Sequence, residues 1–99
     1  MSRVRHWNGS QFTDRQNAGA LELTREQIEK LEAQAKAVSP RFTLVVSTRF
    51  PIVFVRYGDL DDDSGALYKI SRYMVASFND LQEAVKIALE EIMAEVVVR

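Results

Sequence analysis

Four aspartates crowded into one short segment are the side chains best placed to do chemistry in this chain. Asp59, Asp61 and Asp63 have the spacing of the first three ligands of an EF-hand calcium loop. The match then fails, because Ser64 stands where that loop needs glycine and Ile70 where it needs a bidentate acid. We therefore expect no metal site, and interpret the segment as a solvated turn or as an acidic patch that meets a basic partner.

Catalytic chemistry lacks the side chains that it needs. The chain has no cysteine and a single histidine, His6, so neither a thiolate site nor a multi-histidine metal site can be built. A Ser/His/Asp triad would depend on His6, which lies in the least patterned part of the sequence. No glycine-rich phosphate-binding pattern occurs. The sequence predicts a protein that is not an enzyme and uses no cofactor.

Length and composition predict one globular domain. The 99 residues are 46% hydrophobic and 27% charged, with a net charge of −1. We expect residues 1–20 to form a leader or linker and residues 21–99 a single α+β domain. No apolar run approaches the ~20 residues that span a bilayer, and no apolar stretch follows the basic N-terminus. A cytoplasmic protein without membrane contact is expected.

The first helix carries a strong start signal. Thr24 and Gln27 have the spacing of a capping box, and Leu23 with Ile28 that of a hydrophobic staple. Ser39-Pro40 should end this helix, because a residue before proline is pushed out of the helical region.

The second helix should begin near Ser77 or Asn79, where Ser77 and Asp80 form a box-like start. Its apolar side chains recur at helical spacing. They are Leu81, Ala84, Val85, Ala88, Leu89 and Ile92. The tail Val96–Val98 could extend the helix, form a short strand or pack on another chain.

Three β-type runs lie between the helices, at residues 42–47, 52–57 and 67–75. In the leader, Asn8-Gly9 is typical of a hairpin turn, and a flexible leader is the alternative. The order αβββα predicts a three-stranded antiparallel sheet with both helices packed on one face.

The alternation of apolar residues predicts which side chains form the core. We expect Leu31, Ile28, Val38, Leu44, Val46, Ile52, Phe54, Ile70, Leu81, Val85, Leu89 and Ile92 there. The opposite face would then carry Val45, Val53, Val55, Tyr73 and Val75, which is too apolar to leave bare. A partner, a second copy, or the leader with Trp7 and Phe12 should cover it.

The order of elements resembles that of double-stranded-RNA-binding domains, which grip phosphates with lysines at the start of the last helix. At that place this chain has Ser77 to Glu83, with two acids and no basic residue. Acids there suit the helix dipole but repel phosphate. A separate basic strip is conceivable on the strands, from Arg41, Arg49, Arg56, Lys69 and Arg72, joined by Arg3, Arg5 and Arg15 of the leader.

We therefore expect a small non-catalytic protein-binding module: a regulator, adaptor or inhibitor of the kind found among bacterial and phage accessory proteins. Its partner would be a protein, for which a basic surface is one option, or a second copy of the chain. The candidate contact residues are Asp59, Asp61, Asp62, Asp63, Tyr57, Tyr73 and Ile87, with the Val96–Val98 tail. The alternatives are a nucleic-acid-binding domain that uses the arginines, and a homo-oligomeric structural protein.

Overall fold

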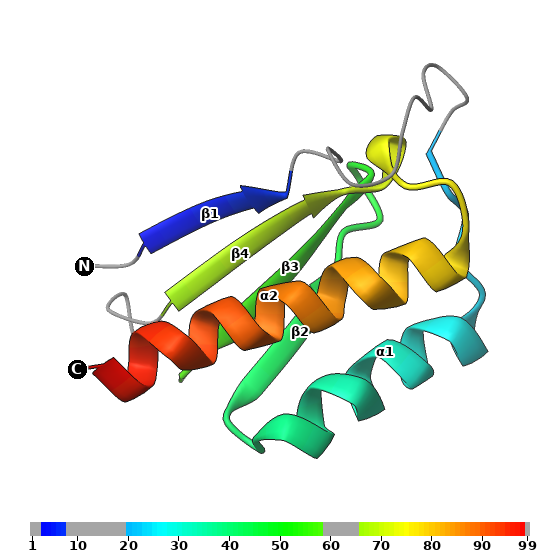
Figure 1. Cartoon of the computed structure of the whole chain (residues 1–99). Helices are drawn as coiled ribbons and strands as arrows, with labels where there is room; N and C mark the ends of the chain where they lie inside the picture. The colour runs from blue at the N-terminus through cyan, green and yellow to red at the C-terminus, as the bar shows by residue number, and fades with distance from the viewer. Residues whose placement is uncertain (1–2, 8–19, 59–65, 99) are drawn as a thin grey trace.

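The computed structural model describes residues 3–7, 20–58 and 66–98. In these ranges four strands form one sheet in the order β1-β4-β3-β2, and two helices pack against it (Figure 1). The elements are β1 (Arg3–Trp7), α1 (Arg25–Val38), β2 (Phe42–Val46), β3 (Ile52–Tyr57), β4 (Ala66–Ser71), the 3-10 turn η1 (Arg72–Met74) and α2 (Phe78–Val98).

The expected α+β arrangement is confirmed. Strands β2, β3 and β4 are antiparallel neighbours, and both helices lie on the same face of the sheet (Figure 1). α1 packs on β2, while α2 packs on β4 and β3 and also touches α1.

Local signals in the sequence explain where the helices begin. The Thr24 hydroxyl accepts a hydrogen bond from the Gln27 amide at 3.2 Å, and the Gln27 side chain accepts one from the Thr24 amide at 3.0 Å. This is the predicted capping box, which satisfies amides that have no partner inside a helix. At the other helix, the Ser77 hydroxyl accepts from the Asp80 amide at 3.3 Å. α2 continues to Val98, so the valine tail extends the helix.

The sequence offered a hairpin in the leader as one alternative, but it did not predict that β1 would join the sheet as a fourth strand. β1 pairs in parallel with β4, from Arg3 opposite Ala66 to Trp7 opposite Ile70. β1 therefore widens the sheet at its edge. The Asn8-Gly9 hairpin predicted for the leader, and Phe12, lie outside the described residues, and the proposed domain boundary at residue 20 stays a prediction.

The third predicted strand is shorter than expected. It ends at Ser71 rather than Val75, and the chain turns into η1. The Arg72 amide donates to the Pro51 carbonyl at 2.7 Å, and the Ser71 hydroxyl then accepts from the Tyr73 amide at 3.3 Å. A serine that caps the next turn takes the backbone out of the strand ladder, and this accounts for the early end.

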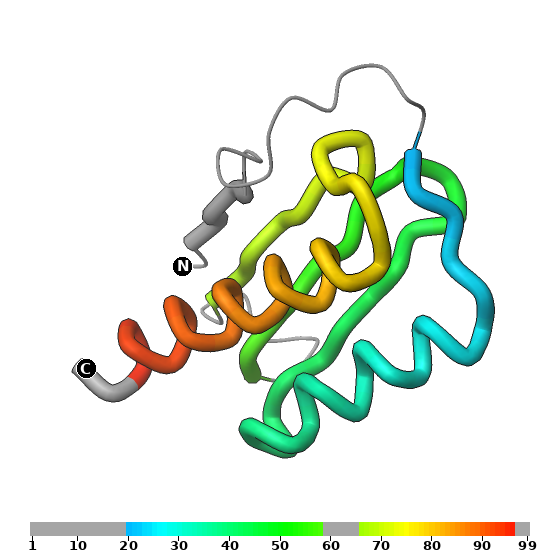
Figure 2. The backbone as a smooth tube through the Cα atoms, turned by 45° about the vertical axis from the view of Figure 1, so that its right-hand side comes forward, coloured from blue at the N-terminus to red at the C-terminus, as the bar shows by residue number. Residues whose placement is uncertain are grey.

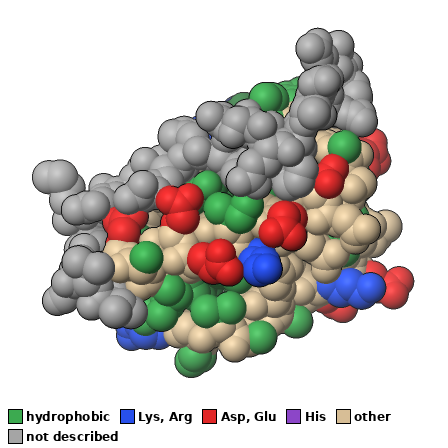
Figure 3. Space-filling model, in the orientation of Figure 1, with side chains coloured by type: hydrophobic (Ala, Val, Ile, Leu, Met, Phe, Trp, Pro, Cys, Tyr) green, Lys and Arg blue, Asp and Glu red, His purple; other side chains and the backbone are tan. Residues whose placement is uncertain are grey.

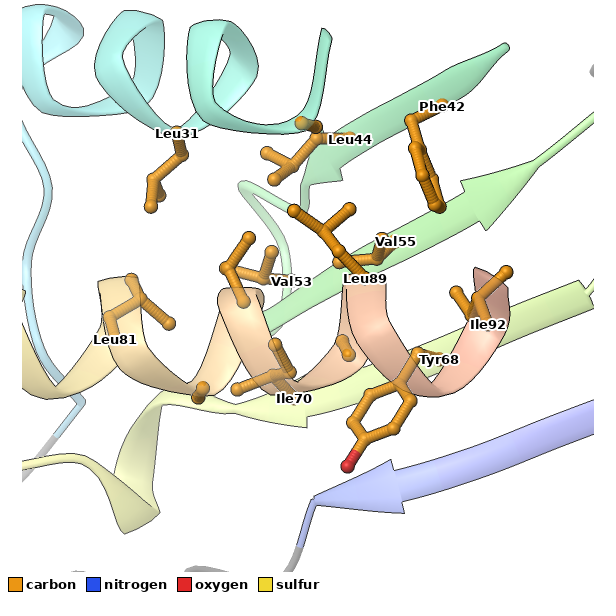
Figure 4. Close-up of a cluster of buried hydrophobic side chains, with 14 of the residues drawn as sticks. Leu31, Phe42, Leu44, Val53, Val55, Tyr68, Ile70, Leu81, Leu89 and Ile92 are labelled. Carbon is orange, nitrogen blue, oxygen red and sulfur yellow. The ribbon is translucent and has the colours of Figure 1, made fainter. Parts of the chain in front are cut away.

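The core lies between the sheet and the helices (Figure 4). Seven of the predicted core residues are buried, and Val46 packs against them. The seven are Leu31, Leu44, Ile70, Leu81, Val85, Leu89 and Ile92. Figure 4 shows Leu31 of α1 and Leu81 of α2 directed toward Val53 and Ile70 on the strands.

The prediction of which β3 side chains face the core was wrong. Val53 and Val55 are fully buried, whereas Ile52 and Phe54 lie on the opposite face and are half-buried. The register explains this, because Val46 pairs with Val53 and directly opposed residues share a face. Val38 was also misassigned, since half of it is exposed at the end of α1.

The outer face of the sheet therefore differs from the expected one. Val53, Val55 and Val75 belong to the core and need no cover, and Tyr73 lies beyond the end of β4. The register gives the outer face the following residues of β2, β3 and β4: Thr43, Val45, Ile52, Phe54, Arg56, Leu67, Lys69 and Ser71. No described helix covers this face, and Val45 is 43% exposed on it.

Candidate interaction surface

Three large apolar side chains are exposed at one end of the sheet. Phe50 is 54% exposed in the turn between β2 and β3, and Tyr73 and Met74 are 51% and 39% exposed in η1. The two segments are neighbours, because the Arg72 amide bonds to the Pro51 carbonyl. We call Phe50, Tyr73 and Met74 the apolar corner.

The turn that carries Phe50 is built by Ser47. The Ser47 hydroxyl accepts hydrogen bonds from the amides of Arg49, at 3.2 Å, and Phe50, at 3.0 Å. Ser47 and Ile52 close the turn, with the Ser47 amide 3.0 Å from the Ile52 carbonyl oxygen. A serine that holds two amides in this way defines the path of a turn, so Phe50 is presented on an ordered backbone.

Arg72 ties three segments together at this end of the molecule. Its guanidinium donates to the carbonyls of Leu21, at 2.6 Å, Ser47, at 3.3 Å, and Phe50, at 3.4 Å. The Arg72 carbonyl accepts in return from the Leu21 amide at 3.3 Å. An arginine offers several donors in a rigid planar fork, and hydrogen bonds from a charged donor are stronger than neutral ones. The contacts of this one side chain therefore fix the position of the segment before α1 and the turn after β2 relative to η1.

An open groove lies beside the same arginine. It has a volume of about 490 Å³, and its lining comes from the segment before α1, from α1 itself, from the end of β2 and from η1. The lining residues are Ala20, Glu22, Leu23, Ile28, Val46, Ser47, Thr48 and Arg72. Figure 2 shows the backbone of residues 20–24 passing beside the turn that follows β2.

The predicted contact residues that the structure describes lie apart from one another. Tyr57 is half-buried at the far end of β3, where its ring meets Phe42 edge to face with centroids 5.0 Å apart. Tyr73 lies at the opposite end of the sheet, in the apolar corner, and Ile87 is half-buried on α2. Of the aromatic and aliphatic candidates, Tyr73 alone is strongly exposed among the described residues.

The acidic candidates are not described by the structure, whereas other acidic side chains are exposed on α2. Asp59, Asp61, Asp62 and Asp63 lie outside the described residues, so their role stays a prediction. Figure 3 shows acidic side chains along the outer side of α2. The exposed charges there are Glu83, Glu90 and Glu91, with Lys86 among them.

Three of the arginines assigned to the predicted basic strip make contacts within the fold. Arg72 is engaged with three carbonyls, Arg41 stacks on the Tyr57 ring at 5.6 Å, and Arg49 stacks on the Phe50 ring at 5.4 Å. Arg15 lies outside the described residues. Among the described residues no group of histidine and carboxylate side chains is placed to hold a metal ion.

Phe50 and Met74 were not among the final predicted contact residues, although both are exposed. Phe50 carried a signal, since a large aromatic residue is unusual in a tight turn. Met74 gave no such signal, because residues 67–75 were predicted to form one strand and a methionine inside a strand is usually a core residue.

None of the described helices has the length and apolarity to cross a membrane. No family model matches the chain, and no curated protein and no solved structure matches it either.

Proposed function

We propose that the protein is a small non-catalytic protein-binding module whose apolar corner is its main contact surface. The observation that carries the proposal is the exposure of Phe50, Tyr73 and Met74 on two neighbouring turns. Aromatic residues and methionine are enriched in protein interfaces, and a few such side chains supply most of the binding energy.

The hydrogen bonds that hold the backbone of the two turns in place support this function. Ser47 and Arg72 hold the backbone on both sides of the apolar corner through hydrogen bonds. A surface that is ordered before binding loses less conformational entropy when a partner docks. The corner is thus suited to a partner that presents a complementary apolar pocket.

The charges of Arg49 and of α2 favour a partner that carries charged as well as apolar groups. Arg49 stacks on Phe50 and places a positive charge at the rim of the corner, while α2 carries an acidic outer side. Charged rims accelerate encounter and select partners more than they raise affinity. We propose that the acidic side of α2 orients a partner with basic groups.

Site-specific photo-crosslinking in the native host tests the proposal. A photoreactive phenylalanine analogue replaces Phe50 in one variant and Tyr73 in another, and a third variant carries it at Val38, which is exposed on α1. The first two variants should crosslink to the same protein and the third should not. The captured partner is then purified, and its affinity is measured by titration calorimetry.

Phe50→Ser and Tyr73→Ser should each weaken that affinity at least about tenfold, because hot-spot residues contribute on the order of 2 kcal/mol. Val38→Ser is the matched control, which removes an exposed apolar side chain elsewhere. Unchanged affinity in both corner variants, with unfolding midpoints like that of the parent, would contradict the proposal.

A further inference from the structure

We propose that the free edge of β2, together with the groove at its end, binds an extended peptide that carries a basic side chain. The inference names the partner's conformation and charge, and it rests on the proposed protein-binding function. It uses Leu44, Val46 and Glu22, which lie outside the apolar corner.

The hydrogen bonds of β2 show which main-chain groups point outward. The Gly58 amide donates to the Arg41 carbonyl at 3.0 Å, and the Ser47 amide donates to the Ile52 carbonyl at 3.0 Å. Because bonded positions alternate along an antiparallel pair, Thr43 and Val45 bond to β3, while Leu44 and Val46 point their amides and carbonyls away from it.

Among the described strands these outward groups have no neighbour, since β2 is the last strand of the sheet. The Phe42 amide is satisfied by the Ser39 carbonyl at 3.2 Å, which leaves only its carbonyl free on that side. For Leu44 and Val46 the described residues supply no further main-chain partner. An added strand would therefore meet two amides and three carbonyls in alternation.

The sequence of β2 does not protect this edge. Natural edge strands avoid unwanted pairing with proline, charged residues or bulges, and Phe42–Val46 contains no proline and no charge. Addition of a strand from another chain to such an edge is an established mode of peptide recognition.

The groove supplies the side-chain chemistry. Its apolar part is formed by Leu23, Ile28 and Val46, so it accepts the aliphatic stem of a long side chain. Its charged groups are Glu22 and Arg72, and the Arg72 guanidinium is already engaged with three carbonyls. The Arg72 guanidinium keeps its positive charge, but the side chain is half-buried and directed at these carbonyls, whereas Glu22 is exposed. The charged group that a peptide side chain can reach is therefore the Glu22 carboxylate, which favours lysine or arginine at the peptide position over the groove.

A second copy of the chain does not fit this edge. Paired strands lie about 4.8 Å apart, whereas packed helices need about 8–10 Å between their axes. α1 packs on β2, so pairing of β2 with its own copy would place two α1 helices closer than this spacing allows. A lone peptide strand brings no helix with it.

Amide hydrogen exchange with defined peptides tests the inference. The probe is a short blocked peptide of alternating valine and threonine with an arginine near one end, placed to lie over the groove. Saturating peptide should slow exchange at Leu44 and Val46 at least about tenfold and leave Thr43 and Val45 unchanged, since these two already bond to β3. The same peptide with its edge-facing amides N-methylated should give no protection.

Charge reversal gives the matched test of the groove. In the parent protein, the arginine peptide should bind more tightly than a peptide with glutamate at that position. Glu22→Lys should invert this preference, and the Kd of each peptide should change about fivefold between the parent and the variant. Glu29→Lys, an exposed charge reversal on α1, should leave the preference as it is.

The failure of this inference differs from the failure of the proposed function. Phe50→Ser should leave peptide protection of β2 intact, because Phe50 is not part of the edge or the groove. Unchanged exchange at Leu44 and Val46 with saturating arginine peptide would overturn the inference, as would protection that appears without peptide and rises with protein concentration. The crosslinking result at Phe50 and Tyr73 would stand in either case.

Discussion

At the scale of single residues, Arg72 has the most consequential role. Its position inside a predicted strand suggested a surface cation that could contact phosphate. The structure instead directs its guanidinium to the carbonyls of Leu21, Ser47 and Phe50. The buried Nε atom has no partner among the described residues, which shows how far the side chain is drawn into the fold. Arg72 is a structural residue that positions the apolar corner.

Arg72→Lys should lower the free energy of unfolding by about 2 kcal/mol, measured by urea denaturation. Lysine keeps the charge but not the planar fork, so it cannot reach all three carbonyls together. Arg49→Lys is the control, since Arg49 is exposed and stacks only on Phe50, and should cost less than about 0.5 kcal/mol. Equal losses for the two variants would show that the fork geometry is unimportant.

At the scale of elements, the caps that start the helices could be predicted from the sequence, whereas the pairing of β1 with the distant strand β4 could not. The capping box of Thr24 and Gln27 and the serine start of α2 involve groups three residues apart, so the sequence reveals them directly. The turn into η1 depends on Ser71 acting as a cap, which a β-rich run from Leu67 to Val75 concealed.

The inner face of β3 is an instructive error. Ile52 to Val55 is apolar on both faces, so alternation alone cannot choose between them. The predicted strand limits nevertheless contained the answer. If residues 47 and 52 close the turn, Val46 opposes Val53, and opposed residues share a face. Counting across the turn from the correctly placed Leu44 would have put Val53 and Val55 in the core.

Thr24→Ala should lower the free energy of unfolding by about 1 kcal/mol, because the Gln27 amide loses its acceptor and the capping box is lost. Thermal and urea denaturation followed by circular dichroism measure the effect. Thr48→Ala, an exposed loop threonine, should change stability by less than about 0.5 kcal/mol. A Thr24→Ala variant as stable as the control would mean that the cap contributes nothing.

At the scale of the whole molecule, the sheet separates one buried face from one face without a described helix over it. The expected outer face was too apolar because it included Val53, Val55 and Val75, which are core residues. The observed outer face mixes Val45 and Phe54 with Arg56 and Lys69. The sequence therefore predicted the layers correctly but assigned several residues to the wrong face of the sheet. With those residues in the core, the outer face is less apolar than expected, and much of the original reason to expect a partner over it is gone.

A pair of matched valines tests which face is the core. Val53→Thr should destabilise the protein by about 2 kcal/mol, because it buries a hydroxyl at a fully enclosed site. Val45→Thr makes the same change on the outer face, where the side chain is 43% exposed, and should cost less than about 0.5 kcal/mol. Urea denaturation of both variants gives the comparison, and the reverse order would show that the two faces have been exchanged.

The parallel pairing of β1 with β4 has a consequence for how the molecule is made. Residues 3–7 leave the ribosome long before Ala66–Ser71, yet the register joins these two segments directly. The contact closes a loop of most of the chain, so its entropic cost is large and it cannot form early in folding. Translation must deliver β2, β3 and β4 before the first strand has a place to dock. β1, although it precedes these three strands in the chain, is thus the last of the four to join the sheet.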